Sequence, residues 1–188
     1  MADTSDLKKG MVIKHQNDLW QVDDTTLVDQ ARGSAVIRVK MTNLSEGHNQ
    51  EETFQSGTKI EIADIRHKNM QFLYKESERF AFMDQENYET IEINKDTIGE
   101  DEKYLKEGLE VIVKLHEGQP VSIKLPQKIS YKVEQAPPAT KGDTASGNVT
   151  KEVTLQNGFQ VDVPIFIEQG EKININTETG EYAERAGA

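Results

Sequence analysis

Short stretches in which apolar and polar residues alternate recur along the whole chain, and turn sequences separate them. From Ile37 to Thr42, apolar and polar side chains alternate at every step, which is the period of a half-buried strand. Further strands are predicted at Asp18–Val28, Met70–Lys75, Arg79–Met83, Tyr88–Ile93, Leu109–His116, Pro120–Leu125, Lys151–Leu155, Phe159–Ile167, Glu171–Thr177 and Gly180–Arg185. Many short strands at this spacing predict an all-β protein built from small β-barrels rather than a helical or βαβ fold.

The sequence also indicates how these strands divide into domains. The 188 residues contain only 6% aromatic residues and have a mean hydropathy of -0.68, which favours several small cores over one large core. The stretches 56–69 and 125–140 fit joins near residues 64 and 127, and Pro137 and Pro138 stiffen the entry to the last domain. The predicted domains are therefore 1–63, 64–127 and 128–188. Only 101–108 has a helical pattern, which ends at Gly108.

The formal net charge of -11 argues against a protein that coats nucleic acid without selectivity, and each predicted domain is acidic. There is no cysteine, so disulfides and thiolate metal sites are excluded. The N-terminal sequence lacks the apolar segment of a signal peptide, and no apolar run approaches the ~20 residues of a membrane span. These features predict a cytoplasmic protein without membrane contact.

No recognisable catalytic pattern is present. The four histidines lie at positions 15, 48, 67 and 116, without the spacing of a metal motif. Glycine-rich phosphate-binding motifs are absent, and Ser146, the serine nearest to glycines, has no evident base. We therefore expect a protein that is not an enzyme and needs no metal or cofactor.

The clearest candidate functional residue is Arg32, which stands among Ala31, Gly33 and Ser34 at the turn of a predicted hairpin. Small neighbours allow the turn to approach another surface closely. With ~3.3 Å per residue, about eight residues of strand would carry the guanidinium roughly 25 Å beyond the barrel. An ordinary exposed turn residue is the alternative interpretation.

Two further segments carry weaker signals. The polar loop 141–148 offers hydroxyls and backbone amides that could contact RNA, or is simply a flexible loop. In 180–185, alternation places Tyr182 on the face opposite to Arg185. A buried tyrosine beside an exposed ion pair would explain the second segment without any function.

Taken together, these segments resemble those of bacterial elongation factor P over essentially the whole chain. The matching landmarks are KKGMVI (8–13), ARGSAVIRVKMTNL (31–44), FMDQENYE (82–89), LPQKI (125–129), TKGDTASG (140–147), VPIFIEQGEKI (163–173) and TGEYAER (179–185). Seven landmarks in order, at matching separations, make the resemblance specific.

The resemblance implies an SH3-like (KOW-like) barrel followed by two OB-fold barrels, arranged in an L outline similar to transfer RNA. It implies a cytoplasmic monomer that binds the 70S ribosome between the peptidyl and exit sites and relieves stalling at consecutive prolines. Arg32 would reach the CCA end of the peptidyl-tRNA. The loop formed by Gly142, Asp143, Thr144, Ala145, Ser146 and Gly147 would lie near the small subunit and the exit-site codon. Tyr182 and Arg185 would contact RNA or support the structure.

The sequence departs from the family pattern at the hairpin turn. Many members carry a modified lysine in a Pro-Gly-Lys context, whereas Gln30, Ala31 and Arg32 stand here. A guanidinium, with a pKa above ~12, is a poor nucleophile and cannot be aminoacylated like a lysine amine. Arginine-type members are modified by an arginine rhamnosyltransferase but usually follow the arginine with asparagine or serine, not with a residue like Gly33. Rhamnosylated and unmodified Arg32 both remain open.

Two other interpretations remain open at this point. The paralogous elongation factor P-like protein shares the ARG turn and the KKGM opening, although GDTASG and GEYAER favour the true factor. A generic OB-fold single-strand binder would need exposed stacking aromatics and a basic groove, which the composition disfavours.

Overall fold

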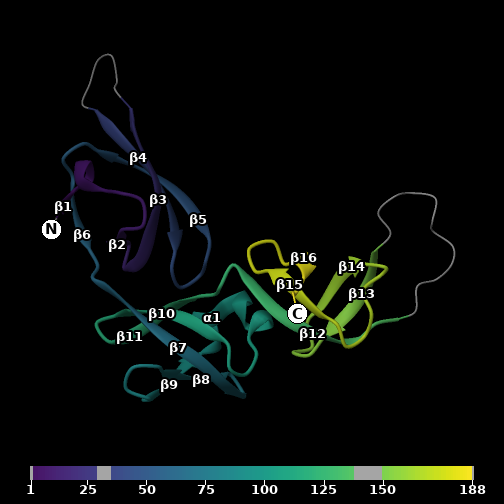
Figure 1. Ribbon diagram of the computed structural model, residues 1–188. Coiled ribbons are helices and arrows are strands. Elements are labelled where there is room, and N and C mark those ends of the chain that lie inside the picture. Colours follow the sequence, from purple (N-terminus) through teal and green to yellow (C-terminus); the bar gives the residue numbers. More distant parts are fainter. Residues whose placement is uncertain (1, 29–34, 138–149, 188) are drawn as a thin grey trace.

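The computed structural model describes residues 2–28, 35–137 and 150–187. Within these ranges the chain forms three antiparallel sheets, one after another along the sequence (Figure 1). The predicted all-β class of small barrels is confirmed. In the described ranges, no helix is both long and apolar enough to cross a membrane.

The first sheet contains six strands in the order β1-β6-β2-β3-β4-β5. Their bounds are β1 (Ala2–Asp3), β2 (Val12–His15), β3 (Asp18–Val28), β4 (Val36–Asn43), β5 (Asn49–Gln55) and β6 (Lys59–Ile62), with a short 3-10 turn η1 (Thr4–Asp6) after β1. Alternating apolar residues of β3 and β4 enclose a small core with Ile13, Trp20, Val22, Val39 and Met41 at its centre. This unit therefore has a core of its own.

The second sheet has the order β11-β10-β7-β8-β9. Its strands are β7 (Ile65–Glu76), β8 (Arg79–Asp84), β9 (Thr90–Asn94), β10 (Glu110–His116) and β11 (Gln119–Lys124). The short helix α1 (Lys95–Ile98) and the 3-10 helix η2 (Gly99–Tyr104) connect β9 to β10. Phe80 and Phe82 of β8 are fully buried and face Phe72 of β7.

The third sheet has the order β14-β13-β12-β15-β16. Its strands are β12 (Lys128–Gln135), β13 (Thr150–Leu155), β14 (Gln160–Pro164), β15 (Lys172–Asn176) and β16 (Tyr182–Arg185). In β12 the burial alternates at every residue, so that Ile129, Tyr131 and Val133 point inward. The outer strands β14 and β16 approach each other, which curls the sheet towards a barrel.

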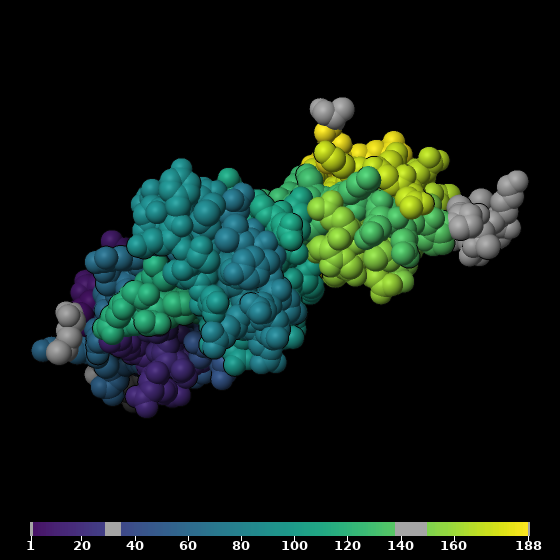
Figure 2. Space-filling model, turned by 90° about the horizontal axis from the view of Figure 1, so that it is seen from below, coloured from purple at the N-terminus to yellow at the C-terminus, as the bar shows by residue number. Residues whose placement is uncertain are grey.

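The second and third sheets share one continuous core, whereas the first sheet has a separate one. The Tyr131 hydroxyl donates a hydrogen bond to the carbonyl of Tyr104, and the rings of Tyr104 and Phe159 meet edge to face at 5.4 Å. Asn157 Nδ2 donates to the carbonyl of Lys103 at 2.7 Å. The three units form an L, with the second unit at the corner (Figure 1). In Figure 2 the third unit continues directly from the second.

Some of the predicted local structure is wrong. The helix predicted at 101–108 is displaced towards the N-terminus, because η2 ends at Tyr104 and Leu105 is already extended. Gly108 does not end this helix. It adopts a left-handed conformation (φ 79°) in the turn that leads into β10. The stretches 56–69 and 125–140 also contain strands that were not predicted, namely β6, the first part of β7 and the central strand β12, although residues 64 and 127 themselves lie between strands.

We expect the turn after β8 to make stability depend on acidity through Asp84. This carboxylate is only 2% exposed, accepts a bond from Lys68 Nζ and accepts the Glu86 N–H at 2.9 Å. The hydrogen bond from Lys68 is the largest cause, and that from the Glu86 N–H the second largest, of a pKa of Asp84 below its ordinary value of 3.8. Because the pKa of Asp84 is lower in the folded than in the unfolded protein, the carboxylate contributes its full stabilisation at a pH above the unfolded pKa. This contribution is lost as the pH falls through the folded pKa.

The measurement is urea unfolding of wild type and Asp84→Asn across pH. The stability deficit of Asp84→Asn should be complete at about pH 7 and should shrink between about pH 4 and pH 2. A deficit that stays constant down to pH 2 would contradict this role of the carboxylate.

Candidate functional site

The hairpin that carries the predicted Arg32 turn is well defined up to the turn. β3 and β4 pair from Trp20 opposite Asn43 to Val28 opposite Val36, with a bulge between Val22 and Asp24. Near the distal end, the Ser56 N–H donates to the carbonyl of Ala35 at 2.9 Å. Ala31, Arg32, Gly33 and Ser34 lie outside the described residues, so the structure fixes the two strands that lead to them.

The predicted hairpin does not stand alone as two strands in its described part. β5 pairs with β4 along its length, from Thr42 opposite Asn49 to Val36 opposite Gln55. The support of the turn is thus three strands wide, because the polar sequence of β5 continues the sheet beyond β4. On its other edge β3 pairs with β2 up to Gln21, and Val22 forms backbone hydrogen bonds with Gly10 and Met11. Beyond Val22, no further strand among the described residues pairs with this edge.

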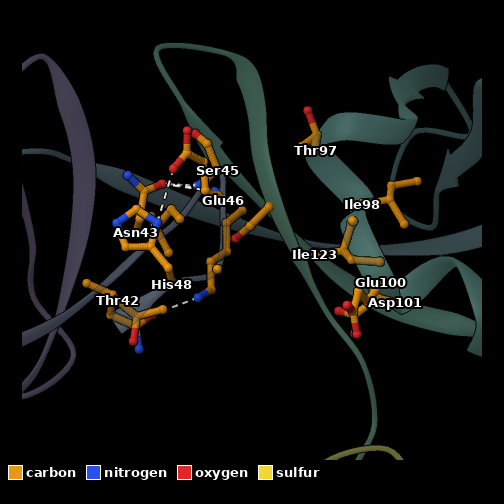
Figure 3. Close-up of a pocket in the computed structure, with 16 residues that line it drawn as sticks. Thr42, Asn43, Ser45, Glu46, His48, Thr97, Ile98, Glu100, Asp101 and Ile123 are labelled. Carbon is orange, nitrogen blue, oxygen red and sulfur yellow. Dashed lines mark hydrogen bonds and ion pairs between the residues drawn. The ribbon is translucent and has the colours of Figure 1, made fainter. Parts of the chain in front are cut away.

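A cleft of about 560 Å³ lies between the first and second units, at the base of this hairpin (Figure 3). Thr42, Asn43, Ser45, Glu46 and His48 form one wall, and Thr97, Ile98, Glu100, Asp101 and Ile123 form the other (Figure 3). Burial raises the pKa of the Asp101 carboxyl, although Lys103 opposes the shift. Among the described residues, no group of three or more acidic or histidine side chains is placed to hold a metal ion.

Across this cleft, Lys114 of β10 donates a hydrogen bond from Nζ to Oε1 of Gln21 on β3, at 2.7 Å. Burial lowers the pKa of Lys114, and repulsion from Lys124 lowers it further. The bond therefore ties the base of the hairpin to the second unit with a partly desolvated ammonium. Sequence reasoning missed this pair, because the two residues are 93 positions apart and neither belongs to a motif.

We expect Lys114→Met to loosen the first unit relative to the second without unfolding either. The free energy of unfolding should change by less than about 1 kcal/mol, because loss of the hydrogen bond is offset by removal of a buried ammonium. Small-angle X-ray scattering should then show a wider spread of overall dimensions than for wild type. Unchanged scattering would mean that Lys114 does not hold the first unit in a fixed orientation relative to the second.

The second predicted contact region, Gly142 to Gly147, also lies outside the described residues. β12 ends at Gln135 and β13 begins at Thr150, so the loop leaves and re-enters the third sheet between two adjacent strands. Val133 pairs with Leu155 and Gln135 with Thr154 across this junction. Lys151 Nζ donates to the carbonyl of Pro137 at 3.2 Å, which holds the ends of the loop together.

Tyr182 and Arg185, the remaining candidates, lie on β16. Tyr182 is half-buried against the shared core and pairs with Ile175 of β15. Arg185 donates from Nη2 to the carbonyl of Phe166 at 3.1 Å, forms an ion pair with Glu171 at 3.3 Å and lies 4.9 Å from the centre of the Phe166 ring. These contacts connect β16 to the segment after β14, so they favour structural support over RNA contact for Arg185.

The candidate regions thus occupy separate places on the L. The hairpin belongs to the first unit, and the loop and β16 belong to the third. Such an arrangement suits contact with one large partner at several points better than conversion of a small molecule at one pocket.

Comparison with known proteins divides the chain into the same three regions as the three sheets. Residues 3–60 match the model of the elongation factor P KOW-like domain, 65–123 that of its OB domain and 129–185 that of its C-terminal domain. The chain is 44% identical over 185 residues to elongation factor P from Syntrophus aciditrophicus, with 98% of both chains covered. The chain belongs to the elongation factor P family. It is therefore a translation elongation factor by family, with an OB domain between its other two regions.

Solved structures share the fold over two thirds of the chain. Eukaryotic translation initiation factor 5A from Methanococcus jannaschii superposes with a TM-score of 0.54 at 24% identity, covering 66% of this chain and 91% of that one. A translation initiation factor eif-5a family protein from Naegleria fowleri gives 0.52 at 17% identity, covering 66% and 96%. At these identities the likeness concerns the fold.

Proposed function

We propose that this protein binds the ribosome between the peptidyl and exit sites and promotes peptide-bond formation at polyproline stalls. Arg32 at the turn of the β3–β4 hairpin would contact the CCA end of the peptidyl-tRNA. The ribosome performs the chemistry, and the protein holds a poorly reactive prolyl donor in a geometry that can be attacked. The protein acts in this proposal without a cofactor and as a monomer.

The observation that carries the proposal is the pairing of β3 and β4 up to Val28 and Val36, in a chain of this family. The pairing continues to the last described residues of both strands, and β5 widens their support by pairing with β4. A stiff support matters because positioning can supply up to ~7–11 kcal/mol only when the aligned groups are held accurately. Each ~1.4 kcal/mol corresponds to a tenfold change in rate.

We further propose three domains with boundaries 1–63, 64–127 and 128–188. The three sheets, which span residues 2–62, 65–124 and 128–185, support these boundaries. The loop of Gly142 to Gly147 would contact the small subunit near the exit-site codon. The third sheet, whose strands β12 and β13 flank this loop in the sequence, forms the other end of the L from the first sheet (Figure 1). Tyr182 and Arg185 would hold β16 in place and so support the domain that carries this loop.

The experiment is in vitro translation of a reporter with consecutive prolines, with and without the protein. The proposal expects faster synthesis of the polyproline reporter and no change for a matched reporter without prolines. Tight binding to free single-stranded oligonucleotides, without any effect on translation, would instead support a generic OB-fold binder. Intact mass of protein from its native host decides whether a rhamnosyltransferase acts on Arg32.

A further inference from the structure

The outer face of the third sheet carries lysines to which the proposed function assigns no contact. On this face β12 presents Lys128, Ser130 and Lys132, and β15 pairs with them through Asn176, Asn174 and Lys172. Lys106 of the second unit lies beside β12, where its Nζ donates to the carbonyl of Ser130 and lies 5.2 Å from the centre of the Tyr131 ring. We refer to Lys106, Lys128, Lys132 and Lys172 as the lysine patch.

Two lysines of the patch oppose each other directly. Lys132 and Lys172 are cross-strand partners, both exposed, and like charges in this position destabilise a sheet. Within the described ranges, neither of them nor Lys106 has a carboxylate within 4.0 Å. Burial and the charge of Lys172 together lower the pKa of Lys106. The fold therefore keeps unbalanced positive charge here at a cost to its own stability.

Acidic residues around the patch balance it only in part. Lys128 Nζ lies 2.9 Å from Glu184 Oε1 on β16, so this lysine is paired. Glu134 and Glu107 are close to Lys132 and Lys106 in the chain, but they form no ion pair with them in the described structure. On a chain with a net charge of -11, a region with four lysines, of which only Lys128 has an ion-pair partner in the described structure, is locally positive.

We propose that the lysine patch binds the phosphate backbone of an RNA strand. This inference rests on the proposed function, because the ribosome and its tRNA supply the RNA. From Lys128 to Lys132 the strand spans about 13 Å, enough to follow several phosphates of one strand. Between the lysines, the Ser130 hydroxyl donates to Asn174 Oδ1 at 2.5 Å, and Asn174 Nδ2 donates to Glu184 Oε1 at 3.3 Å. The second hydrogen of Asn174 Nδ2 could donate to a phosphate or ribose oxygen.

A structural role and an RNA-binding role lead to opposite results for Lys132→Glu. The substitution places a carboxylate opposite Lys172, so the melting temperature should rise by about 1–2 °C. Affinity for ribosomes carrying peptidyl-tRNA should nevertheless fall about tenfold or more at ~0.1 M salt, because a phosphate contact becomes a repulsion. Higher thermal stability with unchanged ribosome affinity would overturn the proposal.

The number of phosphate contacts can be measured with neutral substitutions. In Lys132→Gln/Lys172→Gln, the slope of log affinity against log salt should be smaller by about 1.5 than in wild type. The control is Lys14→Gln/Lys103→Gln, which removes two lysines already paired with Glu61 and Glu100. Equal slopes for the patch variant and wild type would overturn the proposal, as would an equal decrease in the control.

The nature of the partner requires a second measurement. A photo-crosslinking residue at position 130 should yield a product that ribonuclease shortens, whereas a product joined to a ribosomal protein would overturn the RNA assignment. Failure of this proposal is distinguishable from failure of the proposed function. If wild type binds ribosomes and relieves stalling while the patch variants behave like wild type, only the patch is refuted. If wild type does not bind ribosomes, both are refuted.

Discussion

Replacing Arg32 with alanine is expected to slow peptide-bond formation at a polyproline stall by about 10- to 100-fold relative to wild-type protein. Two or three charge-assisted hydrogen bonds from the guanidinium to RNA would be lost, together worth about 1.4–2.8 kcal/mol in transition-state positioning. Ribosome affinity should change little, because the rest of the L is untouched. The measurement is single-round translation of a reporter with three consecutive prolines.

The matched control is Arg38→Ala, on β4 of the same hairpin. Arg38 is about half exposed and pairs with Glu51 at 3.2 Å, so its loss removes one exposed arginine without changing the turn. We expect Arg38→Ala to retain nearly full activity, because an exposed ion pair contributes at most ~1 kcal/mol. Equal stall relief by wild type and Arg32→Ala would remove the turn from the mechanism.

Replacing Tyr131 with alanine is expected to destabilise the protein by about 3–5 kcal/mol, the usual cost of truncating a buried aromatic residue. Tyr131 is 1% exposed and lies in the core shared by the second and third sheets. Its hydroxyl is the donor to the carbonyl of Tyr104, and burial raises the pKa of Tyr131, so the proton stays on the oxygen. Urea unfolding followed by circular dichroism gives the free energy of unfolding directly.

Two variants separate packing from the hydrogen bond. Tyr131→Phe should cost about 1–2 kcal/mol, because it leaves the buried Tyr104 carbonyl without this donor. Tyr74→Ala, at a side chain that is 49% exposed, should cost no more than about 1 kcal/mol. A cost below 1 kcal/mol for Tyr131→Ala would show that the joint between the second and third units is not anchored here.

The strands were predictable where alternation was strong. β3 occupies the predicted Asp18–Val28, and β10 begins at Glu110, one residue after the predicted start. In β10, Val111, Val113 and Leu115 occupy the inward positions at a spacing of two, so one face is buried and the register is fixed. In β3 only Trp20 and Val22 are buried, before the bulge between Val22 and Asp24. The same logic gave the all-β class.

Strands with polar or ambiguous sequences were missed. β5 has the sequence NQEETFQ, in which Phe54 is the only large apolar residue, and it pairs because β4 offers a free edge. β12 alternates Ile129, Tyr131 and Val133 clearly, but the neighbouring prolines and glutamines made the region resemble a join. The alternation in the sequence of β12 was therefore sufficient to predict this strand.

The candidate site was predictable only through the resemblance. Arg32 among small residues marks a turn, but nothing in the residues alone indicates transfer RNA. The Gln21–Lys114 bond and the lysine patch bring together residues from distant segments, so no local pattern reveals them. Arg185 illustrates the opposite problem, because its partners Phe166 and Glu171 become known only once the third sheet is folded.

The most direct test of the central claim is a structure of the protein on a ribosome stalled with peptidyl-prolyl-tRNA. The account expects the β3–β4 hairpin to enter the peptidyl-transferase centre, with the Arg32 guanidinium within hydrogen-bond distance of the CCA end. A hairpin directed away from the acceptor end of that tRNA, in a complex that still relieves the stall, would contradict it.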